Sequence, residues 1–122
     1  MSRIAIIEDD PVINQMYRMK FETEGFNVRI ADNGQDGIVM VEDFKPDLIL
    51  LDMQMPGMNG DEALKHIRKL KTAKTTPVIV LTNLGEEEAP KDLRQLGILS
   101  YIVKADLTPS QVVERVRTAL KK

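Results

Sequence analysis

The chain has 122 residues, of which 43% are apolar and 30% are charged, with a formal net charge of −2; this size and composition are typical of one globular domain. The absence of Cys and the presence of one His exclude disulfides, thiolate chemistry and a metal centre built from several His residues. No apolar run approaches the roughly 20 residues that span a bilayer and the N-terminus lacks the pattern of a signal peptide, so we expect a cytoplasmic protein that does not bind membranes.

The chain is predicted to begin with a strand and a helix. Residues 4–7 form an apolar run that predicts a strand. Asp10-Pro11 then signals the start of a helix that ends at Gly25, because Asp is a favourable cap, Pro suits the first helical position and Gly suits the residue after the last turn. Four residues at helical spacing are expected on the inward face of this helix: Ile13, Met16, Tyr17 and Phe21.

Two further strands, each followed by a helix, are predicted next. Residues 26–31 alternate polar and apolar side chains, which favours an edge strand, and a modest helix over 35–43 follows. Residues 48–51 are apolar throughout, which is typical of a strand buried on both faces of a parallel sheet. A loop over 54–60 leads to a third helix, whose apolar side chains are Leu64, Ile67 and Leu70.

The last part of the chain predicts two more strands, over 78–81 and 101–103. A short fourth helix is expected over 90–96, ended by Gly97. The last helix is expected to begin after Thr108, because Pro follows this cap residue directly and Gln stands three residues after it. The order of elements predicts a (βα)5 chain, an α/β protein with an open parallel sheet and helices on both faces.

Four of the five predicted strands end in a polar residue: Glu8 and Asp9 follow the first strand, Asp52 the third, Thr82 the fourth and Lys104 the fifth. Because ligands of such sheets bind at the shared carboxyl edge of the strands, we expect these side chains to form one site. Carboxylates held close together require a compensating cation, and an oxygen-only ligand set suits Mg²⁺. The ammonium and hydroxyl groups suit phosphoryl oxygens, so the site predicts phosphoryl transfer to a carboxylate, with Asp52 as the acceptor.

Each of these residues, taken alone, has a more ordinary explanation. Asp9 and Asp10 could serve only to cap a helix. Asp52 could be a turn residue, and Lys104 could be a solvated surface cation. The prediction therefore depends on the joint occurrence of the polar residues at four strand ends, which no single explanation accounts for.

With these residues, the sequence resembles the receiver domain of two-component response regulators over essentially its whole length. The resemblance rests on the following residues: Glu8, Asp9, Asp52, Met55, Pro56, Gly60, Thr82 and Lys104. It implies a flavodoxin-like fold, a three-layer sandwich whose five-stranded parallel sheet has the order 2-1-3-4-5. It also implies a single receiver domain over residues 1–122 without an output domain.

The resemblance further implies how the site works. Asp52 would accept a phosphoryl group from the phosphohistidine of a sensor histidine kinase or of a histidine phosphotransfer protein. The cofactor would be Mg²⁺, or Mn²⁺, bound directly by Asp9, by Asp52 and by the backbone carbonyl of Gln54, whereas Glu8 would act mainly through water. The chain would then be a switch, not an enzyme with a separate substrate, and would catalyse its own phosphorylation and a slow autodephosphorylation.

The resemblance also implies a switch built on two residues. Lys104 and Thr82 would contact the phosphoryl oxygens. Thr82 would move toward the new charge, and Tyr101 would turn inward into the vacated space. The surface that reads out this change would be the fourth predicted helix, the fifth strand and the last helix, roughly residues 88–120, and would bind an output protein or domain that the sequence does not identify.

Two positions depart from the family pattern. Ala105 stands where the family often has Pro after the Lys, so either a strained cis peptide is tolerated there or the loop differs. The resemblance also implies that Gln54 and Leu84 occupy positions that tune autodephosphorylation. Leu84 cannot orient a water molecule by hydrogen bonding, so we expect a long-lived phosphoryl group. We expect that this chain does not bind nucleic acid directly. We also expect it to be a monomer or a weak dimer that forms on phosphorylation.

Two other functions were compared with this one. A phosphohydrolase of the haloacid dehalogenase type would carry a second Asp two residues after its nucleophile, where this chain has Gln54. A flavodoxin-like module that binds a nucleotide or a flavin would need Gly, Ser or Thr after the first strand. The acids at Glu8, Asp9 and Asp10 would instead repel a phosphate unless a cation intervened. The sequence therefore favours the phosphorylated switch.

Overall fold

The computed structural model describes residues 1–121 and contains a five-stranded parallel sheet with the order β2-β1-β3-β4-β5. The strands span Arg3–Ile7 (β1), Asn27–Ala31 (β2), Leu48–Leu51 (β3), Val78–Thr82 (β4) and Ser100–Val103 (β5). The helices span Pro11–Thr23 (α1), Gly34–Phe44 (α2), Gly60–Lys69 (α3) and Pro109–Leu120 (α4). This order confirms the predicted flavodoxin-like fold and the prediction that the strand after the first helix lies at an edge.

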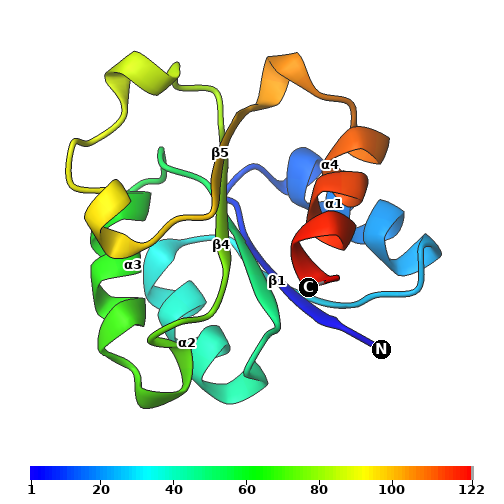
Figure 1. The fold of residues 1–122 in the computed structure, drawn as a ribbon, viewed down its shortest axis with the longest axis horizontal. Coiled ribbons are helices and arrows are strands. Elements are labelled where there is room, and N and C mark those ends of the chain that lie inside the picture. The colour runs from blue at the N-terminus through cyan, green and yellow to red at the C-terminus, as the bar shows by residue number, and fades with distance from the viewer. Residues whose placement is uncertain (122) are drawn as a thin grey trace.

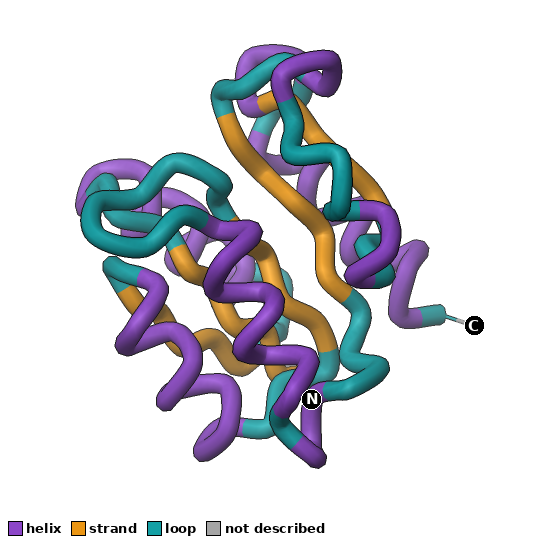
Figure 2. The backbone as a smooth tube through the Cα atoms, turned by 90° about the vertical axis from the view of Figure 1, so that its left-hand side faces the viewer, coloured by secondary structure: helices purple, strands orange, loops and turns teal. Residues whose placement is uncertain are grey.

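The sheet separates two apolar cores. Helices α2 and α3 cover one face and helices α1 and α4 cover the other (Figure 1), and α2 and α3 lie in front of the strands in the perpendicular view of Figure 2. Val41 and Leu64 belong to the first core, and Phe21 and Val112 belong to the second. Strand β3 is buried along its whole length, as its uninterrupted apolar run predicts. None of the helices in residues 1–121 has the length and apolarity that crossing a membrane requires.

Helix α1 begins and ends as its sequence predicts. Oδ1 of Asp10 accepts hydrogen bonds from two backbone N–H groups of the first turn, and Gly25 follows the helix with φ +94°. The expectation for Met16 was wrong, because this side chain is exposed and Asn14 is buried instead. The buried face is centred on Asn14, Tyr17 and Phe21, and the helical period places Met16 on the opposite side.

The fourth predicted helix, over 90–96, does not form as an α-helix. Between β4 and β5 the chain makes two 3₁₀ turns, Glu86–Glu88 (η2) and Arg94–Leu96 (η3). Ala89 lies between them in an extended conformation, with φ −67° and ψ 146°. A residue before proline is disfavoured in the helical region, so Pro90 separates the two turns. The described chain therefore has four α-helices, where five were expected, although Gly97 ends the segment with φ +80° as predicted.

Candidate functional site

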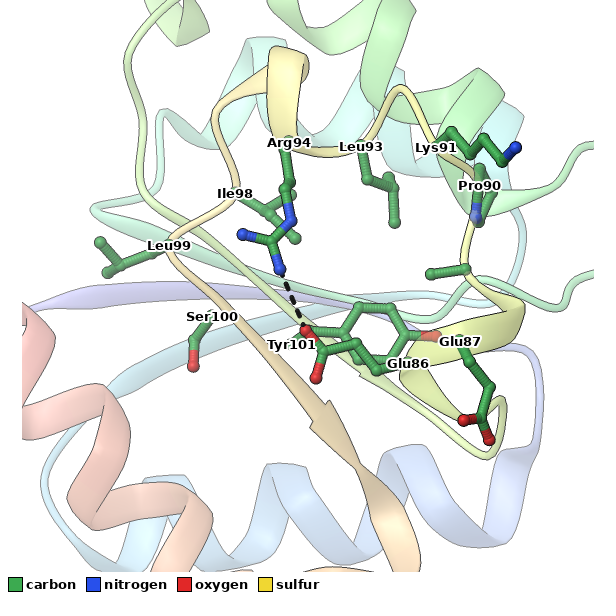
Figure 3. Close-up of a pocket in the computed structure, with 11 residues that line it drawn as sticks. Glu86, Glu87, Pro90, Lys91, Leu93, Arg94, Ile98, Leu99, Ser100 and Tyr101 are labelled. Carbon is green, nitrogen blue, oxygen red and sulfur yellow. Dashed lines mark hydrogen bonds and ion pairs between the residues drawn. The ribbon is translucent and has the colours of Figure 1, made fainter.

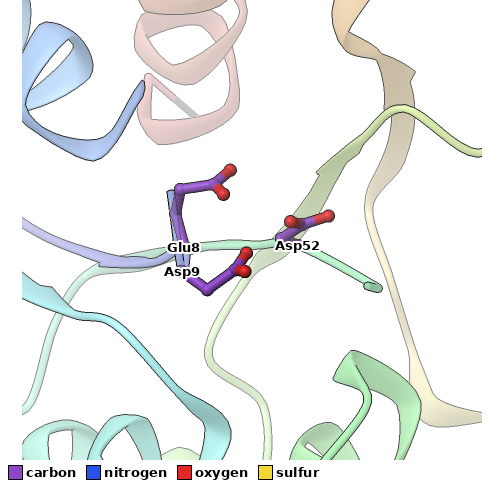
Figure 4. A group of neighbouring side chains, drawn as sticks. All are labelled: Glu8, Asp9 and Asp52. Carbon is purple, nitrogen blue, oxygen red and sulfur yellow. The ribbon is translucent and has the colours of Figure 1, made fainter. Parts of the chain in front are cut away.

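The polar strand ends meet at one edge of the sheet, as the sequence predicts. The last paired residues of the β1–β3 ladder immediately precede Glu8 and Asp52. The β5 residue that pairs with Thr82 immediately precedes Lys104. Carboxylate oxygens of Glu8, Asp9 and Asp52 all lie within 4.8 Å of one another, and Figure 4 shows these side chains coming from two neighbouring strand ends.

Asp52 is fixed by the backbone on both sides. Its own N–H donates to the carbonyl of Ile7 at 3.0 Å, which continues the β1–β3 ladder past the end of the strand. Its Oδ1 accepts a hydrogen bond from the N–H of Gln54 at 3.3 Å. The residue is buried, with 5% of its surface exposed. The Asp52 carboxylate therefore has a defined direction at the edge of the sheet before any ligand binds.

Glu8 is a buried carboxylate with two hydrogen-bond donors. Its Oε2 accepts from the N–H of Asp10 at 3.1 Å, and its Oε1 accepts from Nζ of Lys104. Burial raises the pKa of Glu8 to about 7, because desolvation disfavours the charged form more than Lys104 and the Asp10 N–H favour it. The negative charge of Asp52 contributes to this rise in the pKa.

Lys104 is the cation among these acids. Its Nζ contacts Glu8 and lies 3.6 Å from Oδ2 of Asp52. Lys104 is the one cation that pairs with these three carboxylates in residues 1–121, and its contacts are with Glu8 and Asp52, so negative charge remains uncompensated at this edge. The donor set consists of oxygens alone, and its charge and crowding fit a hard divalent cation such as Mg²⁺. The Lys104–Ala105 peptide bond is trans, so the loop differs from one built on a cis bond.

Thr82 and Tyr101 are joined through the backbone of Leu84. Thr82 is fully buried, and its Oγ1 accepts a hydrogen bond from the N–H of Leu84 at 3.4 Å. The hydroxyl of Tyr101 donates to the carbonyl of Leu84 at 3.1 Å. The Tyr101 ring is half-buried and packs against the core on the α2 and α3 side. Thr82 and Tyr101, which the resemblance predicts to act as a switch, therefore bind the N–H and the carbonyl of the same residue, Leu84.

Tyr101 also borders a hollow of about 680 Å³ between β5 and the two 3₁₀ turns. Leu93 and Ile98 provide apolar side chains, and Figure 3 shows the ion pair between Glu86 and Arg94 close to the Tyr101 ring. Apart from Glu86 and Glu87, its lining residues fall within 88–120, the segment that the resemblance predicts to bind a partner.

The sequence patterns did not identify Asn14, which contacts the backbone of Glu8. This side chain is buried in α1, and its Nδ2 donates to the backbone carbonyl of Glu8 at 3.0 Å. The available signal was a polar residue three positions before the buried Tyr17, on the apolar face of a helix. Helical spacing alone does not tell such a residue from an exposed one.

Comparison with known proteins gives a consistent result. A family model described as "Response regulator receiver domain" matches residues 4–117. The chain is 36% identical over 121 residues to the transcriptional regulatory protein ResD of Bacillus subtilis, which covers 99% of this chain and 49% of ResD. It is 34% identical over 106 residues to the protein PilH of Pseudomonas aeruginosa, covering 85% of this chain and 86% of PilH.

The fold comparison agrees with the sequence comparison. The crystal structure of a CheY-like response regulator receiver domain protein from Methanospirillum hungatei matches with a TM-score of 0.89 at 28% identity. The match covers 98% of this chain and 94% of that one. The chain spans about half the length of ResD, so the similarity to ResD concerns this part of that protein.

Proposed function

Because the chain belongs to the receiver domain family of response regulators, we propose that it is a phosphorylation-dependent switch of two-component signalling in which Asp52 accepts the phosphoryl group. The observation that carries this proposal is the convergence of three carboxylates and the ammonium group of Lys104 at one buried edge of the sheet. Such a cluster combines a nucleophile with the positive charge that a phosphoryl group requires.

The phosphoryl donor is the phosphohistidine of a sensor kinase or of a histidine phosphotransfer protein. An Oδ atom of Asp52 forms a bond to phosphorus while the N–P bond of the donor breaks, and the imidazole leaves with the bonding electrons and takes up a proton. Asp9, Asp52 and the carbonyl of Gln54 would hold Mg²⁺, or Mn²⁺, with Glu8 acting through water. The cation would supply positive charge to the phosphoryl oxygens. Lys104 supplies a second positive charge from the β5 side.

Phosphorylation is proposed to change the surface through Leu84. Once the phosphoryl group is present, the Thr82 hydroxyl binds one of its oxygens and releases the N–H of Leu84. The carbonyl of Leu84, to which Tyr101 donates, is part of the same residue, so the Tyr101 hydroxyl loses a fixed partner. The ring then turns inward, and the hollow lined by Leu93 changes shape.

The altered surface binds the output partner. It comprises the 3₁₀ turns η2 and η3, strand β5 and helix α4. The two 3₁₀ turns take the place of the regular fourth helix that the sequence predicts. We propose a single receiver domain over residues 1–122. We also propose that the phosphoryl group on Asp52 is long-lived, because the side chain of Leu84 cannot orient an attacking water molecule.

The proposal is tested by the intact mass of the chain after incubation with acetyl phosphate, with and without Mg²⁺. We expect one phosphoryl adduct that requires Mg²⁺ and is lost in Asp52→Asn. Asp32→Asn is the matched control, because Asp32 follows β2 at the same edge of the sheet but is exposed, and this variant should keep the adduct. An adduct that persists in Asp52→Asn would overturn the proposal.

A further inference from the structure

The side-chain amide of Asn14 is hydrogen-bonded at its nitrogen but not at its oxygen. The side chain is 4% exposed, and Nδ2 donates to the carbonyl oxygen of Glu8 at 3.0 Å. Oδ1 is buried and has no hydrogen-bond partner among the described residues. The orientation of the amide is fixed by this contact, because its oxygen end would repel the carbonyl oxygen of Glu8.

A buried amide with an unpaired oxygen destabilises the fold, so its presence at this position requires an explanation. Leaving a buried polar atom unpaired lowers the stability of the fold. Leu, which is close in size to Asn, would avoid this cost on an otherwise apolar face. What Leu cannot do is donate to the carbonyl of Glu8. This carbonyl lies beyond the last residue of β1 and accepts no backbone hydrogen bond within the part of the chain that the structure describes. The value of Asn14 therefore lies in its Nδ2 group.

The carbonyl that Asn14 binds belongs to the peptide unit between Glu8 and Asp9. A peptide unit is planar, so a hydrogen bond to its oxygen sets the orientation of the whole unit. The same unit sets where the Cα–Cβ bond of Asp9 points. Glu8 is also held at its N–H by the carbonyl of Ala31 at 3.0 Å, so with Asn14 both peptide units that flank Glu8 are fixed.

We propose that Asn14 is a positioning residue of the cation site: its amide fixes the Glu8–Asp9 peptide unit and thereby aims the Asp9 carboxylate at that of Asp52. This inference rests on the proposed function, because it assumes that the acids bind Mg²⁺. Mg²⁺ demands near-ideal octahedral geometry, whereas Ca²⁺ accepts flexible arrangements of oxygen ligands. A loosened Asp9 should therefore weaken the binding of Mg²⁺ more than that of Ca²⁺.

The test is direct binding of each cation to Asn14→Leu, measured by isothermal titration calorimetry without a phosphoryl donor. We expect Mg²⁺ to bind about tenfold more weakly than to the wild type, a typical loss when a residue that supports a metal ligand is removed, with a smaller loss for Ca²⁺.

Gln15→Leu is the matched control, because it makes the same substitution at the next, exposed position of α1, and it should bind both cations as the wild type does. If Asn14→Leu does not fold, Asn14→Ala carries the same test, since it only removes atoms. Unchanged Mg²⁺ affinity, or an equal loss for Mg²⁺ and Ca²⁺, would overturn the positioning role. A wild-type chain that binds no Mg²⁺ would instead overturn the proposed function.

Discussion

The ammonium nitrogen of Lys104 lies 3.6 Å from Oδ2 of Asp52 and also contacts the carboxylate of Glu8. The three residues follow three different strands, and the parallel register of the sheet brings them together. The Lys104 side chain is 11% exposed, so water screens its charge weakly. Lys104 therefore both offsets the repulsion between the acids and lies where a phosphoryl group on Asp52 would need positive charge.

Replacing Lys104 by Met separates these two roles. The rate of phosphorylation by acetyl phosphate should fall by about 100-fold, as when one stabilising donor is removed from an active site. The affinity for Mg²⁺ should rise, because the ammonium group no longer competes with the cation for Glu8 and Asp52. Lys74→Met, at an exposed lysine far from the acids in sequence, is the control and should change neither quantity. A Lys104→Met variant that is phosphorylated at the wild-type rate would exclude the proposed role.

Glu8 should make the stability of the metal-free chain depend on pH. Its pKa is raised from the ordinary 4.5 to about 7, so between these values the folded chain binds a proton that the unfolded chain has released. The stabilising contribution is fully present below the lower value and is lost as pH rises through the upper one, by about 3 kcal/mol for a shift of this size. The measurement is urea unfolding of the wild type and Glu8→Gln over this pH range.

The difference between the two unfolding free energies isolates Glu8, because Gln does not titrate there and the other acids contribute to both chains. The stability of the wild type relative to Glu8→Gln should fall as pH rises. Parallel pH profiles would show that the carboxylate is not desolvated as the structure indicates.

The sequence predicted most of what positions the site. The four apolar residues of β3 are buried on both faces, as their uninterrupted run implies. The carboxyl ends of parallel strands share one edge of the sheet, so the proximity of Asp52 and Lys104 could be predicted from the sequence. The segment over 90–96 could not be predicted correctly. Gly97 is a typical residue after the end of a helix, and Pro90 is compatible both with the start of a helix and with a break between two turns. The burial of Glu8 depends on packing between distant segments, which local patterns do not contain.

Gly60 should be essential for the packing of α3 against the site. A Cβ atom added there would overlap the carbonyl oxygen of Asp52 and lie 2.9 Å from Cα of Met53. The obstacle is backbone, which cannot move aside as a flexible side chain can. Gly60→Ala should therefore destabilise the fold by about 1–3 kcal/mol and slow phosphorylation of Asp52, as measured by urea unfolding and intact mass.

Gly85→Ala provides the control for this substitution. A Cβ atom at Gly85 would come no closer than 3.5 Å to a neighbour, an ordinary contact with the side chain of Glu87. Stability should change little in this variant. Equal effects at the two glycines would contradict a specific close approach at Gly60.

Arg68 should hold the irregular segment before β5 in place. Its guanidinium group donates to four backbone carbonyls at 2.8–3.2 Å: those of Ala73, Thr76, Leu96 and Gly97. A lysine cannot reproduce this planar arrangement of donors. Arg68→Lys should cost about 2–3 kcal/mol of stability through unpaired carbonyls and speed amide hydrogen exchange over 94–98.

Lys69→Met tests whether this effect is specific, since Lys69 is exposed on the same helix. We expect its stability and its exchange rates to match the wild type. If Arg68→Lys left the exchange of 94–98 unchanged, the segment would be held by other contacts.

The most direct test of the account is to identify the phosphorylated atom. An acyl phosphate, unlike a phosphate ester of Ser or Thr, is reduced by borohydride, which converts the aspartyl residue to homoserine. Peptide mass mapping after treatment with acetyl phosphate, Mg²⁺ and borohydride should find homoserine at position 52. Homoserine at another aspartate, or a borohydride-resistant phosphate on a hydroxyl such as that of Thr82, would contradict the assignment of Asp52 as the phosphoryl acceptor.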